Sequence, residues 1–144
     1  MIKLWDVCKG FNLGQPNKFM AVNGITLSME ANRITVLKGP SGSGKTTLLS
    51  LIACMARPPS GRITLLRARP DSEGPLKSGD GAEIEVASLP ERFLTAIRCK
   101  TFGFIFQQLN LIKGISALEN VMLPAYPLGE KHGVVRARAQ VLLD

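Results

Sequence analysis

Histidine and cysteine are scarce in this sequence, and their scarcity argues against several classes of site. His132 is the only histidine, and the three cysteines are scattered without a C-x-x-C pair. A structural metal site is therefore not expected, and the odd, dispersed cysteines fit a reduced, cytosolic compartment. A Ser-His-Asp hydrolase would have to use His132, which lies in a polar segment next to a glycine, so we discard that class.

Long apolar runs are also missing. Uncharged stretches such as 46–56 and 101–112 fall well short of the roughly 18 apolar residues that a membrane span needs. The first residues include Asp6 and no apolar stretch, so they do not resemble a secretory signal peptide.

What the sequence does hold is the composition of one globular domain with a basic balance. With 144 residues, 45% of them hydrophobic and 20% charged, the chain is too apolar for disorder and too mixed for a coiled coil. The 18 basic residues exceed the 11 acidic ones, which suits phosphate ligands, nucleic acid or anionic lipid. Because the basic residues are spread along the chain, a solvated basic surface is favoured, and no nucleic-acid partner is predicted.

Periodicity and turn residues predict an α/β protein. Strands are expected at 2–11, 19–29 with a break at Asn23-Gly24, 33–38, 62–66, 83–86 and 102–106, and helices at 45–55, 89–98, 116–123 and 133–144. The first two strands are expected to pair antiparallel, whereas 33–38 is predicted to be a buried parallel strand. Ser88 with Glu91 and Ser116 with Glu119 predict capping boxes at two helix starts.

The segment 67–82 is rich in Pro, Gly, Ser and charged residues, which predicts a solvated loop. Its acids, Asp71, Glu73 and Asp80, have no rigid spacing, so a metal site is not expected there. The sequence leaves the role of this acidic loop open.

The strongest motif lies between the expected strand 33–38 and the helix that follows it. Residues 39–47, GPSGSGKTT, match G-x-x-x-x-G-K-[ST] in the strand–loop–helix context that a phosphate-binding loop requires. Glycines there allow close approaches that a Cβ would block, so successive N–H groups can point into one concavity at the positive end of the helix dipole. Lys45 supplies a charge for the β and γ phosphates, and the Thr46 hydroxyl can bind Mg²⁺. The expected nucleotide-binding residues are Gly39, Ser41, Gly42, Ser43, Gly44, Lys45, Thr46 and Thr47.

The sequence around this loop resembles the ATPase domain of ABC transporters. GPSGSGKTTLLSLIACMARPPSGRI is similar to their phosphate-binding loop and following strand, and FGFIFQQLNLIKGISALENVMLP is similar to their Q-loop and the start of their helical subdomain. The Phe-Gln pair followed by Leu-Asn-Leu, Glu-Asn-Val and Pro is most similar to the subclass that serves lipoprotein release, macrolide export and peptide-type permeases. Gln107 falls at the Q-loop glutamine, 62 positions after Lys45. This separation is long for the family, and the loop 67–82 accounts for the excess.

The resemblance covers the whole chain and implies its organisation. It implies a P-loop NTPase core (33–106) with an N-terminal antiparallel β-subdomain (1–32) and the Q-loop with the start of a helical subdomain (107–144), incomplete at the C-terminus. ATP and Mg²⁺ are the implied cofactors, with Thr46 and Gln107 as metal ligands and Gln107 as the catalytic residue. The implied partners are a transmembrane permease, reached through the Q-loop region, and a second ATPase subunit. The implied location is cytoplasmic, on the inner face of the cytoplasmic membrane.

Three further residues take their meaning from the resemblance. Phe11 stands where the family has an adenine-stacking aromatic residue, so stacking on the base is implied, with core packing as the alternative. Trp5 is the second candidate for stacking on the base, but it lies earlier in the chain and is expected to pack in the core instead. Lys38 stands where the family often has an apolar or small residue, and it either has no effect or adds positive charge next to the phosphates.

The resemblance also has gaps. The family's L-S-G-G-Q signature, its Walker B Asp and Glu and its switch histidine do not occur in these residues. We therefore expect an ATPase that powers transport in the parent protein, while the 144-residue chain alone binds nucleotide weakly, does not turn it over and folds poorly. A P-loop kinase or GTPase is the alternative function, but neither an arginine-rich lid nor an N-K-x-D motif is present. The sequence identifies neither the transported substrate nor the direction of transport.

Overall fold

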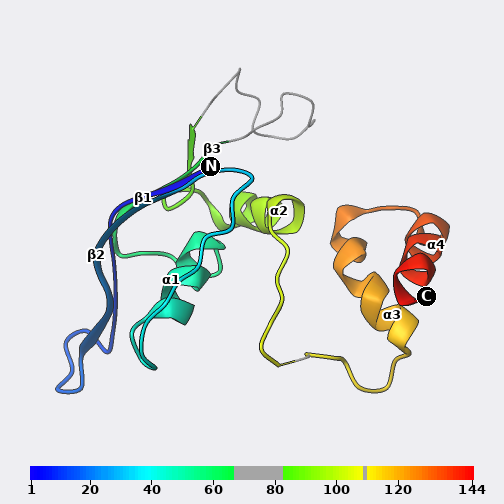
Figure 1. Cartoon of the computed structure of the whole chain (residues 1–144), viewed down its shortest axis with the longest axis horizontal. Helices are drawn as coiled ribbons and strands as arrows, with labels where there is room; N and C mark the ends of the chain where they lie inside the picture. Colours follow the sequence, from blue (N-terminus) through cyan, green and yellow to red (C-terminus); the bar gives the residue numbers. More distant parts are fainter. Residues whose placement is uncertain (67–82, 109) are drawn as a thin grey trace. The chain divides into compact units, whose positions relative to one another are not determined.

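The structure, a computed structural model, describes residues 1–66, 83–108 and 110–144. The predicted acidic loop, with Asp71, Glu73 and Asp80, lies outside these residues. The described chain forms two compact units, Met1–Leu94 and Thr95–Asp144 (Figure 1).

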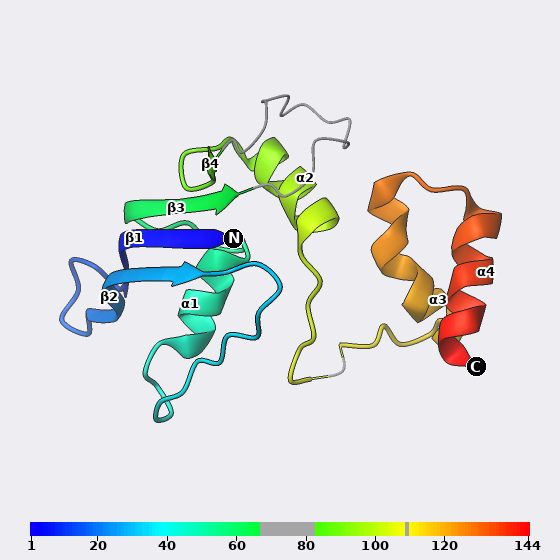
Figure 2. The same ribbon diagram turned by 45° about the horizontal axis from the view of Figure 1, so that its top comes forward.

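A four-stranded antiparallel sheet dominates the first unit. In spatial order its strands are β2 (Phe19–Met29), β1 (Ile2–Phe11), β3 (Ser60–Leu66) and β4 (Glu83–Glu85) (Figure 2). β1 pairs with β2 from Ile2 opposite Met29 to Phe11 opposite Phe19, so the predicted antiparallel pairing of these two segments is confirmed. The register shifts where Gly24 interrupts β2, which makes 19–29 one irregular strand with a local break.

Helix α1 (Lys45–Ile52) follows the phosphate-binding motif and packs against the sheet. Leu48, Leu51 and Ile52 are its buried residues, and their spacing puts them on one side of the helix. They join the buried residues of the sheet, which are Leu4, Val7, Val22, Ile63 and Leu65. The core of the first unit therefore lies between α1 and one face of the sheet.

Two predicted strands are absent from the structure. Residues 33–38 and 102–106 have no regular secondary structure, and neither segment pairs with another among the residues that the structure describes. Ile34 is 94% exposed and Ile105 is fully exposed, so the prediction that 33–38 is buried is wrong. A strand forms only where a neighbour takes its backbone hydrogen bonds, and apolar β-branched residues do not supply that neighbour by themselves.

Two helix boundaries in the first unit differ from the predictions. α1 ends at Ile52, earlier than expected, and Cys54 beyond it has a left-handed φ of 57°. α2 (Glu91–Thr101) begins with a backbone bond accepted by the Pro90 carbonyl, so Ser88 lies too early in the chain to be its N-cap. The predicted capping box at Ser88 is therefore wrong.

The second unit ends in a helical hairpin with a small core. α3 (Ala117–Met122) continues into the 3₁₀ helix η1 (Leu123–Leu128), and α4 (His132–Leu143) follows. Both α-helices were expected from the sequence, whereas η1 was not, because its two prolines indicate a loop. The core consists of Met122, Ala125, Val135 and Ala139. No helix within the described ranges is both long and apolar enough to cross a bilayer.

Ser116 caps α3 with the predicted capping box. Its hydroxyl accepts a hydrogen bond from the Glu119 N–H at 3.2 Å, and the Glu119 carboxylate accepts one from the Ser116 N–H at 2.7 Å. Hydrogen bonds to the charged carboxylate, first from the Ser116 backbone and then from its hydroxyl, lower the pKa of Glu119 below its ordinary value of 4.5. Asn120 of the same helix accepts from the Ile112 N–H at 2.8 Å and so ties the preceding segment to α3.

Replacing Ser116 by alanine is expected to lower the stability of α3 by about 1 kcal/mol at neutral pH, because the N-cap acceptor is lost. Acid should weaken the wild-type helix too. The folded-state pKa of Glu119 lies below that of the unfolded chain, so its contribution is complete above the unfolded pKa and is lost as the pH falls through the folded pKa. Hydrogen-exchange protection of the α3 amides, corrected for intrinsic rates, measures both effects.

Ser88→Ala is the matched control, because Ser88 is an exposed serine that precedes a helix without capping it. At neutral and at acid pH, the α3 amides of Ser88→Ala should be protected to the same degree as those of the wild type at that pH. Equal protection of the wild-type α3 at both pH values would contradict the role given to Glu119.

Candidate functional site

The loop that leads into α1 depends on two glycines with left-handed backbone conformations. The φ angle is 79° at Gly42 and 82° at Gly44, a region in which a side chain is strained. Gly44 is also the N-cap of α1, and a Cβ on it would lie only 2.0 Å from the carbonyl oxygen of Ala21 in β2. Only glycine fits this position, where the loop meets the edge strand of the sheet.

The amino end of α1 has backbone donors that the helix leaves free. The first hydrogen bond of the helix is donated by the Leu48 N–H to the Gly44 carbonyl, at 2.8 Å. The N–H groups of Lys45, Thr46 and Thr47 therefore have no acceptor within the helix, and they carry the positive end of its dipole. Such a helix end attracts phosphate groups.

The Lys45 side chain folds back over the loop. Its Nζ donates to the carbonyl oxygens of Gly39 at 2.9 Å and Pro40 at 2.6 Å, and to Ser43 Oγ at 3.2 Å. These contacts hold the ammonium charge beside the loop and the helix start, where a negative ligand would gain most from it.

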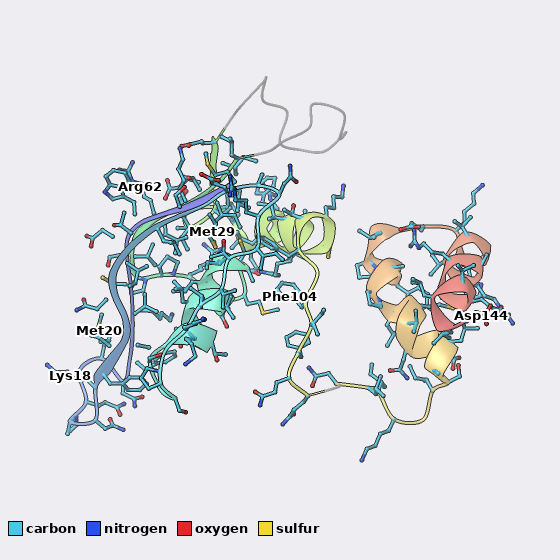
Figure 3. All side chains as sticks on the ribbon, viewed as in Figure 1. Lys18, Met20, Met29, Arg62, Phe104 and Asp144 are labelled. Atoms are coloured by element: carbon cyan, nitrogen blue, oxygen red, sulfur yellow. The ribbon has the colours of Figure 1, made fainter. Side chains whose placement is uncertain are left out.

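A cavity of about 480 Å³ opens between β2, the loop and the start of α1. β2 contributes Met20, Ala21 and Val22 to its wall, and Figure 3 shows Met20 beside the turn of the β1–β2 hairpin. Lys38 and Lys45 both line it, whereas none of the described residues around it is acidic. Two ammonium groups and a helix amino end without a carboxylate favour an anionic ligand.

The structure brings part of the predicted binding set together. Gly39, Ser43, Gly44 and Lys45 line the cavity. Ser41, Gly42, Thr46 and Thr47 adjoin them along the chain without lining it, and all of these but Thr47 are exposed. Lys38 lines the cavity as well, and its effect on a bound ligand stays a prediction.

Both aromatic residues of β1, Trp5 and Phe11, are exposed. Phe11 does not line the cavity, and its ring stacks on Phe19 with centroids 5.4 Å apart. Its 40% exposure does not match the core-packing alternative. The prediction that Trp5 packs in the core is wrong, because it alternates with the buried Leu4 and is 64% exposed.

Gln107 belongs to the second unit. It is exposed and lies in the segment that follows α2. Its metal-binding and catalytic roles stay predictions. Across the described part of the chain, no group of three or more His, Cys, Asp or Glu side chains could hold a metal ion.

Sequence reasoning missed the wall of the cavity that β2 provides. Met20 and Ala21 precede the motif in the chain and share no pattern with it, so the motif alone could not identify them. The one available indication was the glycine at position 44, since an obligatory glycine predicts the close approach of another backbone without saying which one.

Comparisons with known proteins agree with this geometry. The family described as "ABC transporter" matches residues 22–144. The chain is 35% identical to the macrolide export ATP-binding/permease protein MacB of Brucella abortus (strain 2308), over 100% of this chain and 20% of MacB. It is 34% identical to the lipoprotein-releasing system ATP-binding protein LolD 1 of Rhodopseudomonas palustris (strain ATCC BAA-98 / CGA009), over 100% of this chain and 57% of LolD 1.

A solved structure is similar as well. The dimeric structure of a post-hydrolysis state of the ATP-binding cassette MJ0796, bound to ADP and Pi, matches with a TM-score of 0.77 and 32% sequence identity. The match covers 97% of this chain and 54% of that one. The chain therefore spans about half the length of such relatives, and a fifth of MacB.

Gly44→Ala is expected to weaken the binding of a nucleoside triphosphate at least about tenfold, because the loop must move away from Ala21 to make room for the new Cβ. Titration with a fluorescent nucleotide measures the change. Gly14→Ala is the matched control: Gly14 has a similar φ of 87°, nothing within 4 Å of its Cβ position, and no place in the cavity wall. Equal affinities for both variants would show that the contact with Ala21 does not shape the site.

Proposed function

The chain belongs to the ABC transporter family, and from this membership we propose that it binds ATP through the loop 39–47 and forms part of an ATPase that powers transport across a membrane. The observation that carries the proposal is the junction of Gly44 and Lys45. There a helix amino end, an obligatory glycine and an ammonium group meet at one cavity. Membership of this family leaves no reason to prefer a kinase or a GTPase.

The triphosphate would bind at the start of α1. The N–H groups of Lys45, Thr46 and Thr47 would donate to phosphate oxygens, and Lys45 Nζ would exchange its loop carbonyls for the β and γ phosphates. The carbonyls that Lys45 Nζ now contacts belong to the same loop that would hold the phosphates, so the ammonium group would need only a short movement.

Mg²⁺ is the metal that this family membership implies, and we propose Thr46 and Gln107 as its protein ligands. Oxygen donors from a hydroxyl and an amide are the ligands that this hard cation prefers. Thr46 is exposed in the first turn of α1, next to the cavity-lining Lys45, so its hydroxyl suits a phosphate-bound cation. When bound, the ion would neutralise charge on the phosphate oxygens.

Hydrolysis needs more than binding. The cavity wall carries no carboxylate among its described residues, and a carboxylate is the usual group that orients an attacking water. We therefore propose that a polypeptide of these 144 residues binds nucleotide with little turnover, while the parent protein is an ATPase in which Gln107 is the catalytic Q-loop residue.

The proposed partners are a transmembrane permease and a second ATPase subunit, at the cytoplasmic face of the membrane. MacB is named as an ATP-binding/permease protein, and the MJ0796 cassette was solved as a dimer, which supports both partners. We place the permease contact on the segment 110–127, which follows the Q-loop glutamine and in which Leu111, Ile112 and Tyr126 are exposed. We propose three functional segments: the β-subdomain (1–32), the P-loop core (33–106) and the Q-loop with the start of the helical subdomain (107–144). The permease would determine the transported substrate.

Lys45→Ala is expected to weaken ATP binding about 10- to 100-fold, because a charge-assisted contact contributes roughly 1.5–3 kcal/mol. Titration of the chain with a fluorescent ATP analogue measures it. Lys38→Ala is the matched control, because it removes the other ammonium group of the cavity wall and should cost less than Lys45→Ala. Equal ATP affinities for wild type and Lys45→Ala would refute the assignment of the phosphate-binding loop.

Gln107→Ala, made in the complete transporter, is expected to lower the ATPase rate that the permease stimulates while ATP affinity stays within a few-fold. The physical reason is that an exposed loop residue can contact both a metal-bound nucleotide and a partner surface. The neighbouring Gln108→Ala is the matched control, since it is an exposed glutamine in the same loop. A stimulated rate equal in Gln107→Ala and wild type would remove the coupling role.

A further inference from the structure

The segment 110–116, which leads into α3, has few backbone hydrogen bonds of its own. Asn110 has a left-handed φ of 49° and Gly114 one of 87°, so the chain turns on either side of residues 111–113. Among the described residues, no backbone–backbone hydrogen bond involves 111–113. Such a segment needs side-chain partners if its backbone is to keep one conformation.

Asn120 provides these partners from the middle of α3. Its Oδ1 accepts a hydrogen bond from the Ile112 N–H at 2.8 Å, and its Nδ2 donates to the Ile112 carbonyl oxygen at 3.2 Å. The same Nδ2 donates to the carbonyl oxygen of Ser116, the N-cap of α3, at 3.1 Å. One side-chain amide thus bonds to both backbone groups of Ile112 and ties that residue to the start of the helix.

Helix stability does not explain an asparagine at this position. Asparagine is a poorer helix former than alanine, because its side chain competes for backbone hydrogen bonds. Asn120 is half-buried, and it is not one of the residues that form the core between α3 and α4. Its bonds to Ile112 and Ser116 are therefore the physical reason for an amide here.

The backbone that Asn120 holds carries two exposed apolar side chains. Leu111 is 64% exposed and Ile112 is 53% exposed. A partner that buries these side chains does not also have to order the backbone that carries them, because Asn120 has already done so. Ordering a loop costs binding free energy, so a contact made by Leu111 and Ile112 is tighter when their backbone is fixed beforehand.

We propose that Asn120 is a positioning residue for the permease contact: its amide fixes the backbone at Ile112 and so presents Leu111 and Ile112 to the permease. This inference rests on the proposed permease contact at 110–127. Without the amide, both apolar side chains remain in the chain, but their backbone samples more conformations and the permease binds more weakly. The phosphate-binding loop belongs to the other unit, so nucleotide binding does not depend on Asn120.

Titration of the complete ATPase subunit with purified permease in detergent micelles, with the ATPase rate as readout, separates these effects. Asn120→Ala is expected to need about 5- to 30-fold more permease for half-maximal stimulation, because binding must now order the loop. Its rate without permease and its ATP affinity should stay within about twofold of wild type. In the permease-free subunit, the Ile112 amide should exchange at least about fivefold faster, since it loses its acceptor.

A variant with both Leu111→Ala and Ile112→Ala tests whether Asn120 acts through these two side chains. It keeps the backbone groups that Asn120 bonds to, and it should bind the permease more weakly than wild type does. Adding Asn120→Ala to it should then change the half-maximal permease concentration less than twofold, since the side chains to be positioned are gone. Additive losses would overturn the inference.

Gln140→Ala is the matched control, because Gln140 is an exposed amide side chain on α4 of the same unit. It should match the wild type in every measurement. Equal half-maximal permease concentrations for wild type and Asn120→Ala would overturn the inference alone. So would a parallel loss of ATP affinity and stimulation, since the amide would then only support the fold. A wild-type subunit that binds ATP but is not stimulated by the permease would overturn the proposed permease contact, and this inference with it.

Discussion

The close approach of Gly44 to the Ala21 carbonyl is the contact on which the rest of the site depends. It seats the amino end of α1 against the edge strand β2, with no room for a Cβ between them. Because Gly44 is also the N-cap, the same contact sets where the free N–H groups of the helix begin. The position of Lys45, one residue later, follows from it, and so does the part of the cavity wall that β2 supplies.

Charge then decides what this geometry can bind. The helix dipole and Lys45 act at the same place, and Lys38 is a second lysine that lines the same cavity. Each effect alone is modest in water, but they have the same sign, and no acidic residue opposes them in the described lining. A polyanion can interact favourably with the helix amino end and with Lys45 at once, whereas a neutral ligand gains from neither charge.

Several features set by short stretches of sequence could be predicted, although the capping box expected at Ser88 is absent, and features set by distant partners could not be predicted. The capping box at Ser116, the pairing of β1 with β2 and the glycine loop that leads into α1 all depend on spacing within a few residues, and the structure has them. The cavity wall from β2 and the exposure of Trp5 depend on which face of a strand meets α1, which the motif does not encode. The segment 33–38 failed as a strand because its apolar residues specify a buried environment without specifying the neighbour that provides it.

The unpaired segments 33–38 and 102–106 bear on the two proposed functional residues, Lys45 and Gln107, because each segment precedes one of them in the chain. Residues 33–38 run into the loop that carries Lys45, and 102–106 run into Gln107. Their apolar side chains are exposed, and their backbones have no ladder partner within the described ranges. Pairing with any further strand would order the chain on the approach to each residue, so it would be thermodynamically linked to nucleotide binding. Affinity at the loop and order in these segments should therefore rise together, since each removes conformational freedom that the other would otherwise have to remove.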